Sequence, residues 1–210
     1  MQGLIYKDVC LFFKSIEKRL MIIVGVVIIF LIVEAGSYAG FMASVMLAMT
    51  VGIQSVLSFA SDEKANWKKY QMSMPISNYG VVASKYTSIV LILLPCIMGS
   101  VILNLLSSVI YSEWNIVLWE LSILASMLVP LIWAAICMPL TYWFGFRSAQ
   151  TMGLICIFPM IYFIKFFEDG PGLAALPDSM ASYILGLCVI CLILFFLSFL
   201  LSVVGYSRKK

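Results

Sequence analysis

The chain has no histidine, and only 11% of its residues are charged. Without histidine it lacks an imidazole general base, any Ser-His or Cys-His nucleophile pair, and most zinc sites. The sequence also lacks the G-x-x-x-x-G-K-[ST] loop that cradles nucleotide phosphates and the G-x-S-x-G turn of serine hydrolases. These absences argue against an enzyme, and against a chain that hydrolyses ATP by itself.

Opposed acidic residues are also missing from the interior of the apolar stretches, because the charged residues fall at the edges of those stretches. Pumps driven by protons or sodium normally carry ionisable groups near the middle of the membrane. A secondary transporter is therefore disfavoured, and a membrane protein of this kind needs an energy source supplied by another protein.

Cysteine is present but does not indicate disulfides or a metal site. The six cysteines lie in or beside apolar stretches, and Cys188 and Cys191 form a C-x-x-C pair within one of them. A redox or metal role is the alternative, but we interpret them as small buried thiols. The six are Cys10, Cys96, Cys137, Cys156, Cys188 and Cys191.

Hydrophobic residues dominate the chain, at 63% of the sequence with a mean hydropathy of +1.09. Six apolar stretches are long enough to cross a bilayer. We therefore predict an all-α membrane protein with six transmembrane helices in a single domain, residues 1–210. The expected spans are residues 20–38, 40–60, 81–110, 118–144, 148–166 and 180–205.

The charges alternate between the gaps that separate these spans. Twelve of the thirteen Lys and Arg residues fall on one side, with four acidic residues, and only Lys165 falls on the other, with six. Basic residues stay cytoplasmic in short loops, so both termini are predicted to be cytoplasmic. This asymmetry indicates the lipid bilayer as a partner and gives no support to nucleic-acid binding.

Residues 3–20 are predicted to form an amphipathic helix in the cytoplasmic interface. Its apolar face would carry Ile5, Val9, Phe12, Phe13, Ile16 and Leu20, and its basic face Lys7, Lys14 and Lys18. Such a helix is either a membrane anchor or a lever that packs beside a cytoplasmic partner.

The loop after the second span is predicted to contain a short amphipathic helix over residues 61–74. Ser61 can cap its start, Pro75 ends it, and Ser77 or Asn78 can cap the third span. Trp67 and Tyr70 lie three residues apart and share one face. Their rings either sit at lipid headgroups or fill a groove on a soluble partner.

Polar residues inside the apolar stretches have two possible roles. Gln54, Ser55 and Ser58 lie on the second span, and Asn104 lies on the third with Ser100, Ser107 and Ser108. They either hold helices together by hydrogen bonds or line a substrate path. Residues 166–179 are too polar and too broken to cross, and are predicted to lie against the outer surface.

Several segments resemble the small ABC-2 type transporter permeases of bacteria. They are residues 59–70, which read FASDEKANWKKY, then MPISN at 74–78, SKY at 84–86 and GLIYKD at 3–8. The length and the six spans with both ends inside are similar as well. The resemblance implies that two such subunits pair, as a homodimer or a heterodimer, and that each docks a cytosolic ABC ATPase, which holds ATP and magnesium; this chain itself would bind no cofactor.

The resemblance also implies roles for particular residues. The segment 61–74 would be the coupling helix, with 3–20 as the connecting helix beside it and 166–179 as a short external re-entrant segment. The ATPase-coupling residues would be Asp62, Glu63, Lys64, Trp67, Lys68, Lys69 and Tyr70. Gln54, Ser55 and Ser58 would lie along a translocation path.

We therefore expect a permease subunit of an exporter in the bacterial cytoplasmic membrane, with amphipathic or antimicrobial peptides or other lipophilic compounds as cargo. The alternative is a non-transporting membrane subunit that confers immunity or acts as a sensor. An intramembrane enzyme is the weakest of the three hypotheses, because catalytic groups are lacking.

Overall fold

The computed structural model describes residues 2–67, 70–71, 77–147, 151 and 180–208. Within these ranges the secondary structure is helical and no residue lies in a strand, which confirms the predicted all-α class. The chain divides into two compact units, Met1–Ala134 and Ala135–Lys210, and each is described by itself.

Four helices of the described residues are long and apolar enough to cross a membrane. They are Ala39–Lys64, Asn78–Tyr111, Ile116–Phe144 and Gly186–Arg208, and a shorter apolar helix covers Met21–Glu34. The expected span 148–166 and the external segment 166–179 lie outside the described residues. The count of six spans therefore stays a prediction.

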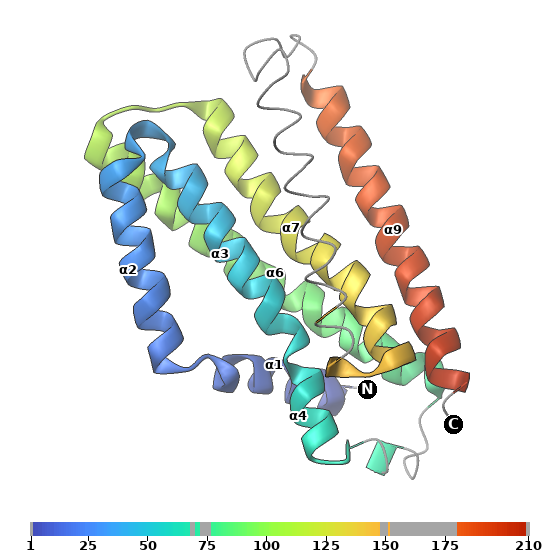
Figure 1. The fold of residues 1–210 in the computed structure, drawn as a ribbon. Helices are drawn as coiled ribbons and strands as arrows, with labels where there is room; N and C mark the ends of the chain where they lie inside the picture. Colours follow the sequence, from blue (N-terminus) through green and yellow to red (C-terminus); the bar gives the residue numbers. More distant parts are fainter. Residues whose placement is uncertain (1, 68–69, 72–76, 148–150, 152–179, 209–210) are drawn as a thin grey trace. The chain divides into compact units, whose positions relative to one another are not determined.

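The first unit contains most of the helices (Figure 1). They are α1 (Gln2–Ser15), α2 (Lys18–Glu34), the 3-10 helix η1 (Gly36–Tyr38), α3 (Ala39–Val56), α4 (Ser58–Lys64), α6 (Asn78–Tyr111) and the first part of α7 (Ile116–Phe144). Helices α2 and α3 run antiparallel, joined by η1, whereas α1 lies across the end at which α2 begins.

Small residues allow α3 to pack closely on α6. Gly40, Ser44, Ala48 and Gly52 repeat every four residues along α3, and all four are buried. A Cβ atom on Gly40 would lie 2.7 Å from the Oδ1 atom of Asn104 and 3.1 Å from its Cα atom. Close backbone contact of this kind is typical of membrane helices, where van der Waals packing replaces the hydrophobic effect as the force between helices.

Asn104 joins three helices through its side-chain amide. Its Nδ2 atom donates to Ser44 Oγ of α3 at 3.1 Å, and its Oδ1 atom accepts from Ser122 Oγ of α7 at 3.0 Å. One turn away on α6, Ser100 Oγ donates to Ser126 Oγ of α7 at 3.2 Å. These contacts favour the helix-holding interpretation of the polar residues on the third span.

The sequence predicts the residue that caps the start of α6 correctly, but not the residue that precedes α4. Ser77 Oγ accepts from the backbone N–H of Gly80 at 3.2 Å, which confirms the predicted cap of α6. The predicted cap at Ser61 is wrong, because α4 begins at Ser58, after a one-residue turn at Leu57. The backbone supplies the contacts there: Leu57 donates to Gln54 O at 3.1 Å, and Ala60 donates to Leu57 O at 3.0 Å.

Helix α1 ends earlier than the predicted interfacial helix, and its buried side chains include an aspartate. It ends at Ser15 instead of residue 20, and it buries Leu4, Asp8 and Phe12, whereas Phe13 is 55% exposed. Gln54 Nε2 of α3 donates to Ser15 O at 2.7 Å, which satisfies a carbonyl left free at the helix end. Phe12 of the predicted apolar face is buried within the unit, and the contact of this face with the membrane stays a prediction.

The second unit contains the end of α7 and α9 (Met180–Arg208). Trp143 Nε1 donates to Leu201 O at 3.1 Å, and the Arg208 guanidinium lies 5.1 Å from the centre of the Trp143 ring. A Cβ atom on Gly205 would lie 2.5 Å from Trp143 Cδ1, so a glycine is needed where the indole crosses α9.

Candidate functional site

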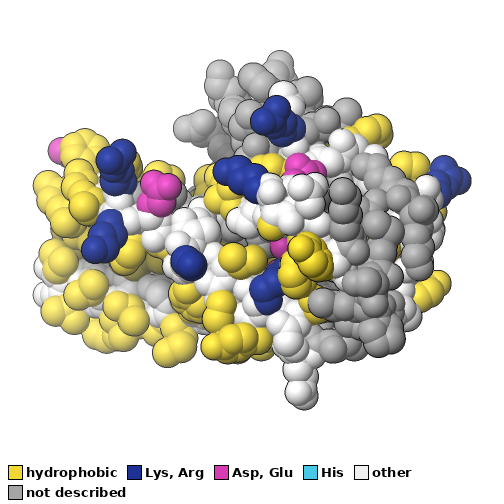
Figure 2. Space-filling model, turned by 90° about the horizontal axis from the view of Figure 1, so that it is seen from below, with side chains coloured by type: hydrophobic (Ala, Val, Ile, Leu, Met, Phe, Trp, Pro, Cys, Tyr) yellow, Lys and Arg dark blue, Asp and Glu magenta, His cyan; other side chains and the backbone are white. Residues whose placement is uncertain are grey.

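The cytoplasmic end predicted for the first unit is formed by α1, α4 and the beginning of α6, which are far apart in the sequence (Figure 1). Each of these helices packs on at least one of the others. Figure 2 views the molecule from this end, where Lys and Arg side chains lie among hydrophobic ones. Four charged side chains from the three helices meet here.

Lys85, near the start of α6, is almost fully buried, with a side chain that is 5% exposed. Its Nζ atom donates to Asp8 Oδ1 of α1 at 2.8 Å, to Asp62 Oδ2 of α4 at 2.6 Å and to Ser58 Oγ of α4 at 3.3 Å. An ammonium group has three N–H donors, so these partners satisfy it fully. The Lys85 ammonium also lies 4.7 Å from the centre of the Phe59 ring.

Lys7 of α1 completes a ring of alternating charges. Its Nζ atom donates to Asp62 Oδ1 at 2.7 Å and lies 3.4 Å from Asp8 Oδ1. Each lysine thus contacts both carboxylates, and each carboxylate contacts both lysines. We call Lys7, Asp8, Asp62 and Lys85 the charge junction.

The energetics of the charge junction explain why all four residues are needed together. Burying an ion costs several kcal/mol, and mutual attraction offsets that cost only with good geometry and satisfied hydrogen bonds. Two positive and two negative charges make the cluster neutral, and the short distances to Lys85 meet the geometric condition. The charge junction therefore holds α1 and α4 against α6.

An aromatic pair lies beside the charge junction. The Trp67 and Tyr70 rings are 6.0 Å apart, and Lys7 Nζ lies 4.5 Å from the centre of the Trp67 ring. Among the side-chain polar atoms of the described residues, Trp67 Nε1 is buried and lacks a hydrogen-bond partner. A buried N–H group without an acceptor is unfavourable, so an acceptor that reaches Trp67 after a local movement would stabilise it.

The other residues predicted to couple to an ATPase are spread around α4. Glu63 and Lys64 are exposed, and Tyr70 is 61% exposed. Lys68 and Lys69 lie outside the described residues. Of the predicted set, Asp62 alone belongs to the charge junction, with Trp67 directly beside it through Lys7.

Gln54, Ser55 and Ser58, predicted to line a path, are buried within the unit. Gln54 holds the end of α1, Ser55 Oγ donates to Gly52 O of its own helix at 2.7 Å, and Ser58 accepts from Lys85. Their place along a translocation path stays a prediction.

Residue patterns alone missed Asp8, Lys7 and Lys85 as functional residues. Two signals could have found them. Asp8 lies on the same helical face as Leu4 and Phe12, and Lys85 lies between Val81 and Ile89 at helical spacing. A charge on an apolar face requires a partner of opposite sign, and both charges fall on the same predicted side of the membrane.

The exposed face of α1 carries Tyr6 and Cys10, one turn apart. A hydrogen bond with the Cys10 thiol raises the pKa of the Tyr6 hydroxyl above its usual value. Tyr6 is 74% exposed and therefore remains a neutral phenol near pH 7. This face of α1 presents uncharged polar groups beside the exposed Lys14.

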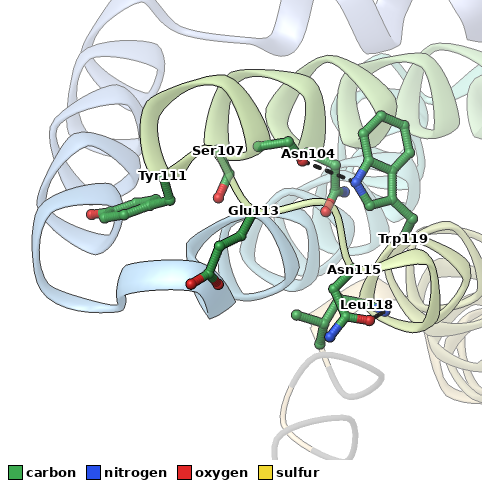
Figure 3. A pocket seen from close by; sticks show the side chains of 8 residues that line it. Asn104, Ser107, Tyr111, Glu113, Asn115, Leu118 and Trp119 are labelled. Carbon is green, nitrogen blue, oxygen red and sulfur yellow. Dashed lines mark hydrogen bonds between the residues drawn. The ribbon is translucent and has the colours of Figure 1, made fainter.

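A second polar feature is a pocket at the opposite end of the first unit (Figure 3). It is lined by Asn104, Ser107, Ser108, Tyr111, Glu113, Asn115, Leu118 and Trp119. Trp119 Nε1 donates to Ser108 Oγ at 3.0 Å, and Asn115 Oδ1 accepts from the N–H of Val117 at 3.1 Å as the cap of α7. These bonds secure the turn between α6 and α7, and we assign the pocket no ligand.

Metal binding finds no support in the described part of the chain, where no cluster of three or more His, Cys, Asp or Glu residues is placed to hold an ion. The charge junction has only two carboxylates, and both are neutralised by lysines. The charge junction connects helices through ion pairs.

The comparison with protein families identifies the family of this chain. Residues 3–207 match the model of the ABC-2 family transporter proteins. The match covers nearly the whole chain, so the chain belongs to this family. It is thus a membrane component of an ABC transporter, a class that works with a separate ABC ATPase. Comparison with curated proteins and with solved structures finds no match.

Proposed function

We propose that this chain is the transmembrane permease subunit of an ATP-driven exporter, with an amphipathic peptide or another lipophilic compound as cargo. Family membership supports the permease role. The observation that carries the mechanism is the charge junction, because it connects the segment expected to meet the ATPase with a long apolar helix.

The proposed transmission runs from α4 to α6. When the ATPases close on ATP, they would push the coupling segment, which includes α4, Trp67 and Tyr70. Asp62 moves with α4 and is bonded to Lys85 of α6, so a displacement of α4 pulls on α6. Helix α6 packs extensively on α3, and the motion would therefore reach the spans.

The cargo class follows from the low charge of the spans. A highly charged solute would lose its hydration along such a path, whereas an amphipathic peptide can keep its apolar face against lipid or protein. We propose that two copies pair and that cargo passes between them, with Gln54, Ser55 and Ser58 near the path. The apolar surface of α2, which exposes Ile22, Val26 and Ile29 among others, is available to lipid or to a second copy.

This orientation is tested by cysteine labelling in intact cells, in a background where the exposed Cys10 is replaced by serine. Glu113→Cys is expected to react with a membrane-impermeant maleimide from outside, and Lys64→Cys only after permeabilisation, because basic residues mark the cytoplasmic side. Both residues are exposed, so access alone separates them. The reverse labelling would overturn the orientation and the coupling role of α4.

Transport is tested by deleting the gene and by purifying the tagged chain from its source cells. An ABC ATPase is expected to copurify, and deletion should make cells sensitive to amphipathic peptides while sugar and ion handling stay normal. A deletion that affects only a polysaccharide or an ion gradient would refute the peptide-like cargo. If no ATPase copurifies, the non-transporting immunity or sensor subunit becomes the better hypothesis.

A further inference from the structure

The charge junction has an inner and an outer half that differ in access to water. The inner pair is Lys85 and Asp8, whose side chains are 5% and 3% exposed. The outer pair is Lys7 and Asp62, at 24% and 16%. The inner pair joins α6 to α1, and Asp62 is the one member of the charge junction on α4.

We propose that the two halves act differently in coupling: the inner pair is a permanent bracket between α1 and α6, and Asp62 is a releasable link through which α4 drives Lys85. This inference rests on the proposed function, since it assigns positioning roles within the same ATP-driven cycle. The inference specifies that the ion pair between Lys85 and Asp8 persists during the cycle and that the one between Lys85 and Asp62 breaks.

The hydrogen bonds show what release of Asp62 would leave behind. Without Asp62, Lys85 keeps Asp8 at 2.8 Å and the rest of its buried surroundings. Lys7 keeps Asp8 at 3.4 Å and the face of Trp67 at 4.5 Å. Both lysines therefore retain a partner, and the partly exposed Asp62 carboxylate can be hydrated.

Breaking the inner pair leaves Lys85 with Asp62 at 2.6 Å, but it leaves the Asp8 carboxylate with less compensation. Asp8 is almost fully enclosed, and its remaining contact, Lys7, lies at 3.4 Å. An uncompensated charge at a buried position is strongly destabilising, and the cost is lower for a carboxylate that lies nearer to water, as Asp62 does. The inner pair is therefore expected to stay closed through the cycle.

The backbone also has a local irregularity between α3 and α4. The two helices are separated by Leu57, where a bond from Leu57 N–H to Gln54 O replaces the usual spacing of four residues with three. At the other end of α4, Asn66 has a φ of 49°, a left-handed conformation that ends the helix. A seven-residue helix between two such points can tilt as a body.

The different roles of the inner pair and of Asp62 can be tested without an ATPase, by measuring the thermal stability of the purified full-length chain. Asp8→Asn is expected to lower the melting temperature by about 10 °C, and Asp62→Asn by less than about 3 °C. Glu17→Gln, which removes a negative charge from an exposed site before α2, is the control. If Asp8→Asn yields no folded protein while Asp62→Asn yields normal amounts, the inference is supported. Equal losses for both variants would overturn it.

Coupling is tested in the complex of permease and ATPase, from the change in ATP turnover that the permease imposes on its ATPase. Asp62→Asn is expected to reduce this change at least about fivefold while the ATPase still copurifies, and Asp62→Glu to restore it. Wild-type coupling in Asp62→Asn would overturn the releasable link. If no ATPase copurifies even with the wild-type chain, the proposed function fails, and the stability comparison still decides the roles of the two pairs.

Discussion

Replacing Lys85 with methionine is expected to destabilise this protein about as much as Asp8→Asn does, and more than any change to the outer pair of the charge junction. The substitution removes the group that contacts Asp8 and Asp62 from α6 and leaves Asp8 buried without a close partner. Breaking a buried ion pair by removing one member typically costs about 3–5 kcal/mol. For a chain of this size that corresponds to a melting temperature lower by about 10 °C, measurable by thermal unfolding in detergent.

Two further variants separate this effect from a general loss of charge. Lys64→Met removes a lysine from the exposed surface of α4 and is expected to change the melting temperature by less than about 2 °C. Lys85→Met combined with Asp8→Asn is expected to recover much of the lost stability, because no buried charge is then left unpaired. A Lys85→Met variant as stable as Lys64→Met would contradict the structural role of the charge junction.

The helices themselves were predictable because hydropathy and length determine them locally. The apolar stretch 81–110 lies within α6, which covers Asn78–Tyr111 and starts at the predicted Ser77 cap. The contact between Trp67 and Tyr70 was also predictable, since residues three apart on a helix are neighbours. Each of these features depends on residues close together in the sequence.

The charge junction could not be predicted in the same way, because its contacts are long-range. Lys85 and Asp8 are separated by 77 positions, and Lys7 and Asp62 by 55. Periodicity treats a charge as a mark of the solvent face, so it assigned Lys7 to the basic face of the N-terminal helix and gave no role to Asp8, which is buried. Only the family resemblance singled out the segments that contain all four residues.

Gln54 illustrates the same limit for an uncharged residue. From sequence it was a candidate for a substrate path, yet its amide holds the end of α1 through Ser15. A free carbonyl at a helix end must find a donor, but the sequence does not say which helix supplies it. The end of α1 at Ser15 was therefore missed, and the sequence left open whether Gln54 holds helices together or lines a path.

Truncating Trp67 to alanine is expected to weaken the association between this chain and its ATPase. Trp67 lies beside the charge junction under Lys7, and its buried Nε1 has an unused N–H group in the described structure. Tryptophans at the centre of an interface often cost about 2 kcal/mol or more when truncated, which is roughly 30-fold in affinity. The measurement is ATPase binding to the purified permease in lipid nanodiscs, together with ATP turnover in the complex.

The variant Trp67→Phe separates the contribution of the aromatic ring to ATPase binding from that of the indole N–H group. Phenylalanine keeps an aromatic ring for Lys7 but removes the N–H group, so an intermediate loss is expected if the ATPase supplies a hydrogen-bond acceptor. Trp114→Ala, at an exposed site near the opposite end of the first unit, is the matched control and should bind the ATPase normally. If Trp67→Ala binds the ATPase and retains wild-type turnover, this face is not the docking surface, and the push on α4 must enter through Glu63, Lys64 or the residues that follow them.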